Sequence, residues 1–189
     1  MAATRLSHRV ATHADADLIQ GIMCASLAEN MRDFLSPLEI AAAQEMCGLD
    51  TTLIDDETYF IVDIDSDDGP VPAGCGGWGK RLTLYGGDHT GGRDDSFSDP
   101  QKDAARIRAM YTHPDWIRRG VGRYLITIAE AAARNAGFKT MELGATLPGE
   151  PLYRTAGYEE YGREESLAAN GATNVIVKMR KSLITDLQR

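Results

Sequence analysis

Residues 113–125 read His113-Pro114-Asp115-Trp116-Ile117-Arg118-Arg119-Gly120-Val121-Gly122-Arg123-Tyr124-Leu125, and they are the most informative part of the sequence. It lies between a β-rich segment at 105–112, which Pro114 ends, and an amphipathic segment from about 119 to 136. A helix N-terminus has backbone N–H groups without internal partners and a partial positive charge. Glycines there let a phosphate approach those groups directly. The stretch therefore predicts a strand, an anion-binding turn and a helix in succession.

The charge around this turn agrees with a phosphorylated ligand. Residues 106–123 carry five arginines and one acid, a net +4, whereas the whole chain carries −8. A basic segment in an acidic protein favours binding of a phosphorylated small molecule. The alternative is that the glycines only permit a tight helix start and that the arginines are solvated.

Two other phosphate-binding motifs do not fit. A dinucleotide-binding turn requires a third glycine where this chain has Leu125, and it places the glycines directly after the strand. A P-loop ends in Gly-Lys-Ser or Gly-Lys-Thr, which is absent here.

The rest of the chain predicts an α/β domain with a mixed sheet. The expected elements follow from alternating apolar and polar residues, from β-rich runs and from two helix-start signals, Thr12–Asp15 and Ser36-Pro37-Leu38-Glu39. We expect strands at 6–11, 59–62, 71–78, 105–112, 140–145, 158–165 and 174–179, and helices at about 12–27, 36–48, 119–136 and 150–155. No linker or internal repeat is visible, so residues 1–189 are expected to form a single domain.

Two segments resemble motifs of the GNAT superfamily of acyl-CoA-dependent N-acyltransferases. Residues 113–125 are similar to its motif A, Q/R-x-x-G-x-G/A, although the Gln or Arg position falls on Ile117. A side-chain contact to the pyrophosphate is then lost unless Arg118 or Arg119 replaces it. Leu152-Tyr153-Arg154-Thr155-Ala156-Gly157-Tyr158 is similar to the family's F-Y-x-x-x-G-F segment. The resemblance covers residues 105–180 well and implies a mostly antiparallel central sheet flanked by helices.

The resemblance also implies roles for particular residues. The acetyl-CoA pyrophosphate is expected at the turn, and the pantetheine arm along the preceding strand, where one amide can stabilise the oxyanion. Tyr153 is expected to protonate the leaving thiolate, with packing in a short helix as its alternative role. The expected acetyl-CoA-binding residues are Met110, Tyr111, Thr112, Arg118, Arg119, Gly120, Val121, Gly122 and Arg123.

The general base is less clear from the residues. Many relatives carry a glutamate on the strand before motif A, where this chain has Arg106 and Arg108. Glu142 on the next strand is the nearest carboxylate and is the candidate base, with an ion pair to one of these arginines as the alternative. His113 could also accept the proton, and so could water.

Residues 79–104 form a long segment rich in glycine and aspartate. We expect a loop, and either a lid over the acceptor amine or a solvated acidic loop is consistent with it. Asp88-His89 with the later aspartates fits no standard metal-site spacing, so no metal is expected.

Composition excludes other classes of function. The net charge of −8 argues against general nucleic-acid binding. No apolar run reaches the ~20 residues of a membrane span, and no signal peptide is visible. Cys24, Cys47 and Cys75 are expected to be small buried hydrophobes in a reducing compartment. A cytoplasmic enzyme is expected.

The acceptor and the assembly stay open at this point. The acceptor is a small-molecule or peptide amine, and the closing strands could pair between subunits of a homodimer. A noncatalytic coenzyme A sensor or interaction module, or use of another acyl-CoA such as propionyl- or succinyl-CoA, is the alternative function.

Overall fold

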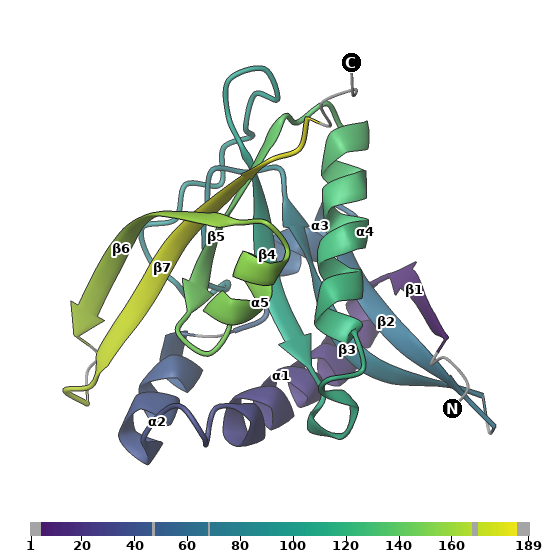
Figure 1. Ribbon diagram of the computed structural model, residues 1–189, viewed down its shortest axis with the longest axis vertical. Helices are drawn as coiled ribbons and strands as arrows, with labels where there is room; N and C mark the ends of the chain where they lie inside the picture. The colour runs from purple at the N-terminus through teal and green to yellow at the C-terminus, as the bar shows by residue number, and fades with distance from the viewer. Residues whose placement is uncertain (1–4, 47, 68, 168–169, 185–189) are drawn as a thin grey trace.

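The seven strands form one sheet whose centre is the pair formed by β4 and β5 (Figure 1). The computed structural model describes residues 5–46, 48–67, 69–167 and 170–184. The sheet order is β1-β2-β3-β4-β5-β7-β6, and β4–β5 is its parallel pair, while the other neighbours are antiparallel. The strands are β1 (Leu6–Val10), β2 (Tyr59–Ser66), β3 (Gly69–Gly79), β4 (Ala105–Thr112), β5 (Thr140–Thr146), β6 (Glu159–Leu167) and β7 (Thr173–Ser182). The predicted mixed, mostly antiparallel sheet flanked by helices is confirmed.

Helices cover both faces of the sheet. They are α1 (Ala16–Asn30), α2 (Pro37–Met46), α3 (Thr51–Asp55), α4 (Val121–Asn135) and α5 (Glu150–Thr155), with 3-10 turns η1 (His13–Asp15) and η2 (Pro114–Trp116). One core cluster joins the sheet to α4 and α5, and a second joins it to α1 and α3. In the described part of the chain, no helix has both the length and the apolar character that crossing a bilayer requires.

Local signals located most helix starts correctly. Glu39 accepts hydrogen bonds from the amide (2.8 Å) and hydroxyl (2.7 Å) of Ser36, which begins α2 as predicted. Helix α3 was not predicted, because five residues are too few to show a helical period. Its first turn is instead set by contacts from a distant loop, in which Asp88 accepts a hydrogen bond from the Thr51 amide.

The cysteines are placed differently from one another. Cys75 is buried as expected, and burial raises the pKa of its thiol to about 12. Cys24 is exposed, so the expectation of burial is wrong for this residue. Cys47 lies outside the described residues.

Candidate active site

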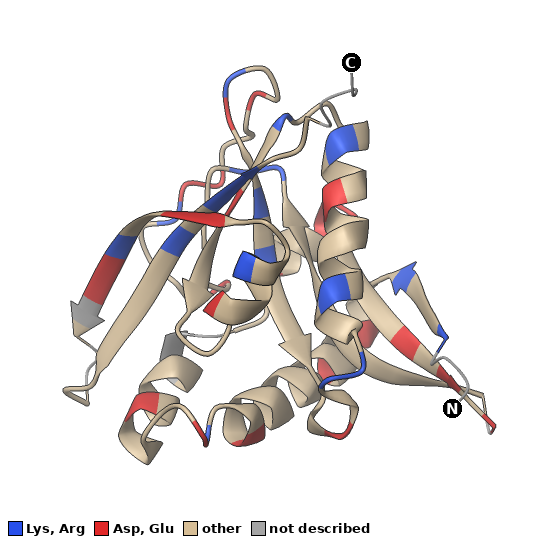
Figure 2. Cartoon of the chain, viewed as in Figure 1, with Lys and Arg blue, Asp and Glu red and all other residues tan. Residues whose placement is uncertain are grey.

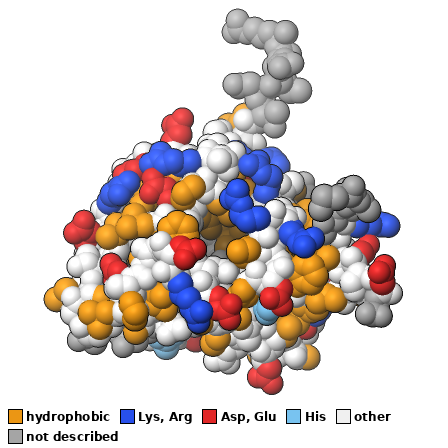
Figure 3. Space-filling view, turned by 60° about the horizontal axis from the view of Figure 1, so that its bottom comes forward, with side chains coloured by type: hydrophobic (Ala, Val, Ile, Leu, Met, Phe, Trp, Pro, Cys, Tyr) orange, Lys and Arg blue, Asp and Glu red, His pale blue; other side chains and the backbone are white. Residues whose placement is uncertain are grey.

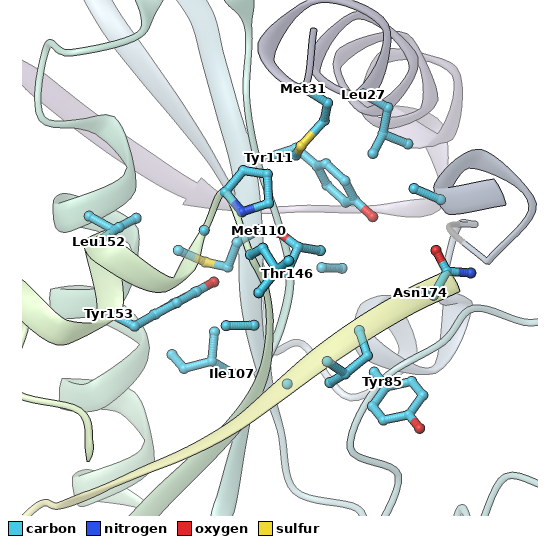
Figure 4. Close-up of a pocket in the computed structure, with 18 of the residues that line it drawn as sticks. Leu27, Met31, Tyr85, Ile107, Met110, Tyr111, Thr146, Leu152, Tyr153 and Asn174 are labelled. Atoms are coloured by element: carbon cyan, nitrogen blue, oxygen red, sulfur yellow. The ribbon is translucent and has the colours of Figure 1, made fainter. Parts of the chain in front are cut away.

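The central strands β4 and β5 separate and leave a cavity between them. They pair only at Ala105 with Met141 and at Arg106 with Glu142. Beyond these pairs β4 stays joined to β3 as far as Thr112, and β5 stays joined to β7 as far as Thr146. Each strand therefore remains in its own half of the sheet while the gap opens toward their carboxyl ends. A cavity of about 270 Å³ occupies this gap (Figure 4).

A bulge in β4 contributes to this separation. The β3–β4 register shifts between Cys75 and Gly77, and Ala109 has the left-handed φ of 49°. A Cβ on Gly76 would lie 2.6 Å from the Met110 sulfur and 3.1 Å from the Met110 Cα, so the glycine favours this close approach of the two strands. The bulge places Met110, Tyr111 and Thr112 along the cavity.

The turn before α4 has the geometry of an anion site. Gly120 is the N-terminal cap of α4 at a φ of 88°, Arg118 also has a positive φ of 61°, and no side chain caps the helix. A Cβ built on Gly120 meets nothing within 4 Å, so the space in front of the free amides is open. Arg118, Arg119 and Arg123 are exposed at this helix start. Figure 2 shows basic residues gathered at the lower end of α4. An open helix start with three cations suits a phosphate group.

Gly122 has a different role from Gly120. A Cβ at Gly122 would lie 2.8 Å from a methyl carbon of Leu152, so this glycine lets α5 pack closely against α4. Gly122 and Leu152 both line the cavity. Gly122, the second glycine of the turn, therefore shapes the wall beside the gap, and its role is steric.

Tyr153 on α5 lines the cavity from the same side as Leu152 (Figure 4). Its ring is 8% exposed and packs edge-on against Tyr158, with 5.9 Å between ring centres. Burial raises the pKa of the Tyr153 phenol well above its usual value, because the phenolate would lose its hydration. The structure thus brings Tyr153 and the expected pantetheine strand to one cavity.

The two candidate bases lie elsewhere. Glu142 is not among the cavity-lining residues; its carboxylate lies 3.4 Å from the Arg106 guanidinium and accepts a hydrogen bond from the Tyr161 hydroxyl at 3.3 Å. This ion pair is the alternative that the sequence left open. His113 caps η2, where its Nδ1 accepts from the Asp115 amide at 3.3 Å, and it does not line the cavity either.

The second half of the cavity wall includes part of the 79–104 loop, which the sequence offered as a lid over the acceptor amine; no sequence motif indicated its other segments. It is built by α1 and the turn after it, by α2, by the loop after β3 and by β7. The main apolar residues of this wall are Leu27, Met31, Leu35, Tyr85, Val175 and Ile176. Figure 4 shows Leu27, Met31 and Tyr85 at the opposite end from Leu152 and Tyr153. The cavity therefore passes through the sheet, from the α4–α5 face to the α1–α2 face.

The loop at 79–104 is held by arginines. Arg81 makes paired hydrogen bonds to Asp56 at 2.7 and 2.8 Å, and Arg93 reaches Asp50 at 3.0 Å. Buried Arg108 on β4 bonds the same Asp50 at 2.6 Å and also the backbone carbonyls of Thr83 and Gly86. In the described ranges, no group of three or more His, Cys, Asp or Glu side chains is placed to hold a metal ion.

A family comparison agrees with the fold. The description of the matching family model is "Acetyltransferase (GNAT) domain", and it matches residues 55–160, more than half of the chain. This range includes the turn before α4 and the segment around Tyr153. No curated protein matches the chain.

Solved structures share the fold at low sequence identity. A GCN5-related N-acetyltransferase from Rhodopseudomonas palustris has a TM-score of 0.67 and 21% identity over 96% of this chain and 98% of that one. An N-acetyltransferase from Staphylococcus aureus has a TM-score of 0.61 and 12% identity over 95% and 99%. The yncA protein of Salmonella typhimurium, solved with its cofactor acetyl-CoA, has a TM-score of 0.58 and 17% identity over 98% of both chains.

Proposed function

The chain belongs to the GNAT acetyltransferase family, and from this premise we propose that it transfers the acetyl group of acetyl-CoA to an amine in a ternary complex. The observation that supports this most is the cavity between β4 and β5, which has the open turn before α4 beside it. A donor held at that turn and an acceptor entering from the α1–α2 side would meet in the gap. No acyl-enzyme is needed for that encounter.

The donor fits the features of the α4–α5 side. We assign the pyrophosphate to the free amides of residues 120–123 and to the exposed Arg118, Arg119 and Arg123, since open backbone donors and cations both favour a phosphate. The pantetheine arm would follow Met110, Tyr111 and Thr112, whose strand has no β5 partner beyond Arg106. An extended chain of amides can pair with such a free strand edge.

The chemistry requires three tasks in the cavity. The amine nitrogen attacks the thioester carbon, the carbonyl electrons move to oxygen, and the C–S bond then breaks to release a thiolate. A backbone amide of residues 110–112 is our candidate for the oxyanion contact. Tyr153 is our candidate acid, since its side chain lines the cavity and its phenol stays protonated; the same raised pKa also makes the phenol a weaker proton donor than an exposed tyrosine.

For the base we favour water over the side chains. Glu142 is ion-paired with Arg106 and lies outside the cavity wall. Glu39 is the one carboxylate on that wall within the described ranges, and its hydrogen bonds from Ser36 lower the pKa of the carboxyl, which weakens it as a base. The ammonium of the acceptor would then lose its proton to solvent in the open gap.

Acetyl is favoured over succinyl as the transferred group. A succinyl carboxylate would need an unpaired cation beside the acyl group, and Arg108, the cation of the described cavity wall, is neutralised by Asp50 at 2.6 Å. A propionyl group differs from acetyl by one methylene and stays possible on size alone. Donor preference is therefore tested with acetyl-, propionyl- and succinyl-CoA side by side.

The experiment that tests the proposal combines binding with turnover. Calorimetry measures acetyl-CoA affinity, and release of free coenzyme A is followed with primary amines present and absent. Amine-dependent release supports the transferase. Tight binding with no release for any amine would favour the alternative, a noncatalytic coenzyme A sensor.

A further inference from the structure

Glu39 on α2 brings a negative charge to the acceptor half of the cavity. Its side chain is half-buried and lines the wall. The hydrogen bonds that it accepts, at 2.8 Å from the Ser36 amide and 2.7 Å from the Ser36 hydroxyl, both end on Oε2. Among the residues that the structure describes, no lysine, arginine or histidine pairs with this carboxylate. These residues therefore leave the charge of Glu39 uncompensated.

Capping of α2 does not require this charge. The amide and hydroxyl of Ser36 are uncharged donors, and a glutamine in place of Glu39 would accept the same bonds in a capping box. A carboxylate has two oxygens with about four acceptor positions, and the cap uses only one oxygen. The bonds from Ser36 also lower the pKa of the carboxyl, so Glu39 is ionised at neutral pH. An ionised oxygen, Oε1, is left for a ligand.

The other charges near the cavity do not cancel that of Glu39. Arg108, the second charged residue of the described wall, is 3% exposed and is neutralised by Asp50 at 2.6 Å. The exposed arginines of the turn before α4 lie on the donor side, where the pyrophosphate is expected. The cavity thus has cations beside its donor half and a free carboxylate in its acceptor half. This arrangement suits an anionic donor and a cationic acceptor.

An apolar stretch of wall leads to Glu39. Leu27, Met31 and Leu35 line the cavity and precede Glu39 along the chain at intervals of four residues. Residues 175 and 176 of β7, a valine and an isoleucine, line it as well. Figure 3 shows a hollow with hydrophobic side chains at its floor and charged side chains of both signs around it. Such a wall favours a hydrocarbon chain between the reacting amine and the cationic group of the acceptor.

Polar side chains accompany Glu39 on the acceptor side. Thr173 and Asn174 line the wall from the start of β7, and α2 lies against this strand. Figure 4 shows Asn174 at the opposite end of the cavity from Tyr153. An alkylammonium group has three N–H donors, and amide and hydroxyl oxygens can accept the bonds that a single carboxylate leaves over. The far end of the acceptor half is therefore suited to an ammonium.

Building on the proposed transferase function, we infer that the acceptor is an aliphatic diamine whose second ammonium binds the Glu39 carboxylate. The reacting amine lies in the gap between β4 and β5, and the methylene chain lies against the wall of α1 and β7. The deprotonated amine forms the C–N bond as the C–S bond of acetyl-CoA breaks. The proton that the nitrogen then loses balances the proton that the thiolate gains. The products are the monoacetylated diamine and coenzyme A.

The test compares amines that differ only at the far end, by release of coenzyme A. Hexylamine, 1,6-diaminohexane and 6-aminohexanoate have equal numbers of carbons and end in a methyl group, an ammonium and a carboxylate. Butylamine, 1,4-diaminobutane and 4-aminobutanoate form a shorter set. In the better of the two sets, kcat/KM should be at least about tenfold higher for the diamine than for the monoamine, as a hydrogen bond to a charged group contributes. The amino acid should be the poorest acceptor of each set.

Variants separate the charge of Glu39 from its role in the cap. Glu39→Gln retains an acceptor for Ser36 and removes the charge, so the diamine-to-monoamine ratio of kcat/KM should fall at least about tenfold. Ser36→Ala removes the cap and keeps the carboxylate; it should lower the temperature of unfolding and keep the ratio within about threefold of wild type. Asp33→Asn is the matched control for charge, because Asp33 is exposed and does not line the cavity. Its ratio should stay within about twofold of wild type, since solvent screens an exposed charge.

The outcomes distinguish this inference from the transferase itself. Turnover of the monoamines with no preference for either diamine, or an unchanged ratio in Glu39→Gln, overturns the role of Glu39 and leaves the transferase intact. Faster turnover of kanamycin than of both diamines overturns the aliphatic spacer. If no amine releases coenzyme A, the transferase is overturned, and calorimetry of 1,6-diaminohexane in the presence of coenzyme A decides the binding site separately. Wild type should then bind the diamine at least about tenfold more tightly than Glu39→Gln, and equal affinities overturn the site.

Discussion

The hydroxyl of Tyr59 on β2 donates a 2.7 Å hydrogen bond to the carbonyl oxygen of Ala109, the residue with positive φ in the β4 bulge. Carbonyl and N–H point in opposite directions across a trans peptide, so this bond also sets the direction of the Met110 amide. Met110 lines the cavity, and its amide is one of our candidates for the oxyanion contact. A tyrosine fifty residues away in the sequence thus orients a peptide at the proposed transfer site.

Replacing Tyr59 with phenylalanine should therefore affect catalysis more than binding. We expect Tyr59→Phe to lower kcat about tenfold, because the 109–110 peptide can rotate, while acetyl-CoA affinity stays within threefold. The lost hydrogen bond should cost about 1 kcal/mol of unfolding free energy. Tyr158→Phe is the matched control, since Tyr158 is equally buried and its hydroxyl has no hydrogen-bond partner among the described residues. Equal kcat values for the two variants would contradict a positioning role.

The turn before α4 is tested with a pair of substitutions of equal size. Gly120→Glu and Gly120→Gln both force a side chain onto a φ of 88°, a backbone strain of about 1–2 kcal/mol. Only glutamate adds a negative charge where the pyrophosphate is expected. We expect calorimetry to show acetyl-CoA affinity at least about tenfold weaker for Gly120→Glu than for Gly120→Gln. Identical affinities would remove the pyrophosphate from this turn.

Tyr153→Phe keeps the buried ring and removes the hydroxyl. If Tyr153 protonates the leaving thiolate, kcat should fall by about 10²–10⁴, the usual contribution of general acid catalysis, with acetyl-CoA binding retained. The measurement is steady-state turnover together with calorimetry. A kcat within a few-fold of wild type means that solvent supplies the proton, and a change confined to stability or KM indicates packing.

The pH dependence follows from the direction of the Tyr153 shift. Burial raises the pKa of this phenol above the usual value of ~10, so the protonated acid persists through the range in which an exposed tyrosine ionises. The turnover rate should rise with pH as the acceptor ammonium loses its proton, and it should not decline below about pH 10. A falling limb between pH 8 and 9 that disappears in Tyr153→Phe would contradict this assignment of the pKa.

Glu142→Gln distinguishes a base from an ion pair. We expect kcat to stay within about threefold of wild type, because the carboxylate contacts Arg106 and Tyr161 and does not line the cavity. Unfolding free energy should fall by about 1–3 kcal/mol, since Arg106 is left without its partner in a half-buried position. Loss of kcat by a hundredfold or more, with the acidic limb of the pH profile removed, would restore Glu142 as the base.

Much of the fold could be predicted because its signals are local. The capping box of Ser36 and Glu39 and the glycine start of α4 depend on residues a few positions apart, as hydrogen bonds and φ preferences do. The same holds for the alternation in β5, whose inward residues are Met141, Leu143 and Ala145. The predicted range of β7, 174–179, ends three residues early, because the charged Arg180 and Lys181 interrupt the β-branched run. The predicted range of β6, 158–165, begins one residue early and ends two residues early.

The site was only partly predictable. Residues 113–125 indicated an anion-binding turn by themselves, since an open helix start next to arginines is a property of that segment. The sequence could not show that Gly122 serves to admit Leu152, nor that Glu142 faces Arg106 away from the cavity. Strand alternation places a side chain on a face, and only the neighbouring strand determines what it meets there.

The sequence alone predicted the order of strands and helices around the turn and the family, and both are confirmed. It also indicated phosphate binding at the turn, which stays a prediction. The contacts across the turn come from packing between distant segments: Tyr59 beneath the bulge, Asp50 against Arg108, and the wall built by α1, the loop after β3 and β7. The reason is physical. Backbone preferences act over a few residues, whereas a cavity and its charge balance arise where surfaces distant in the chain pack together.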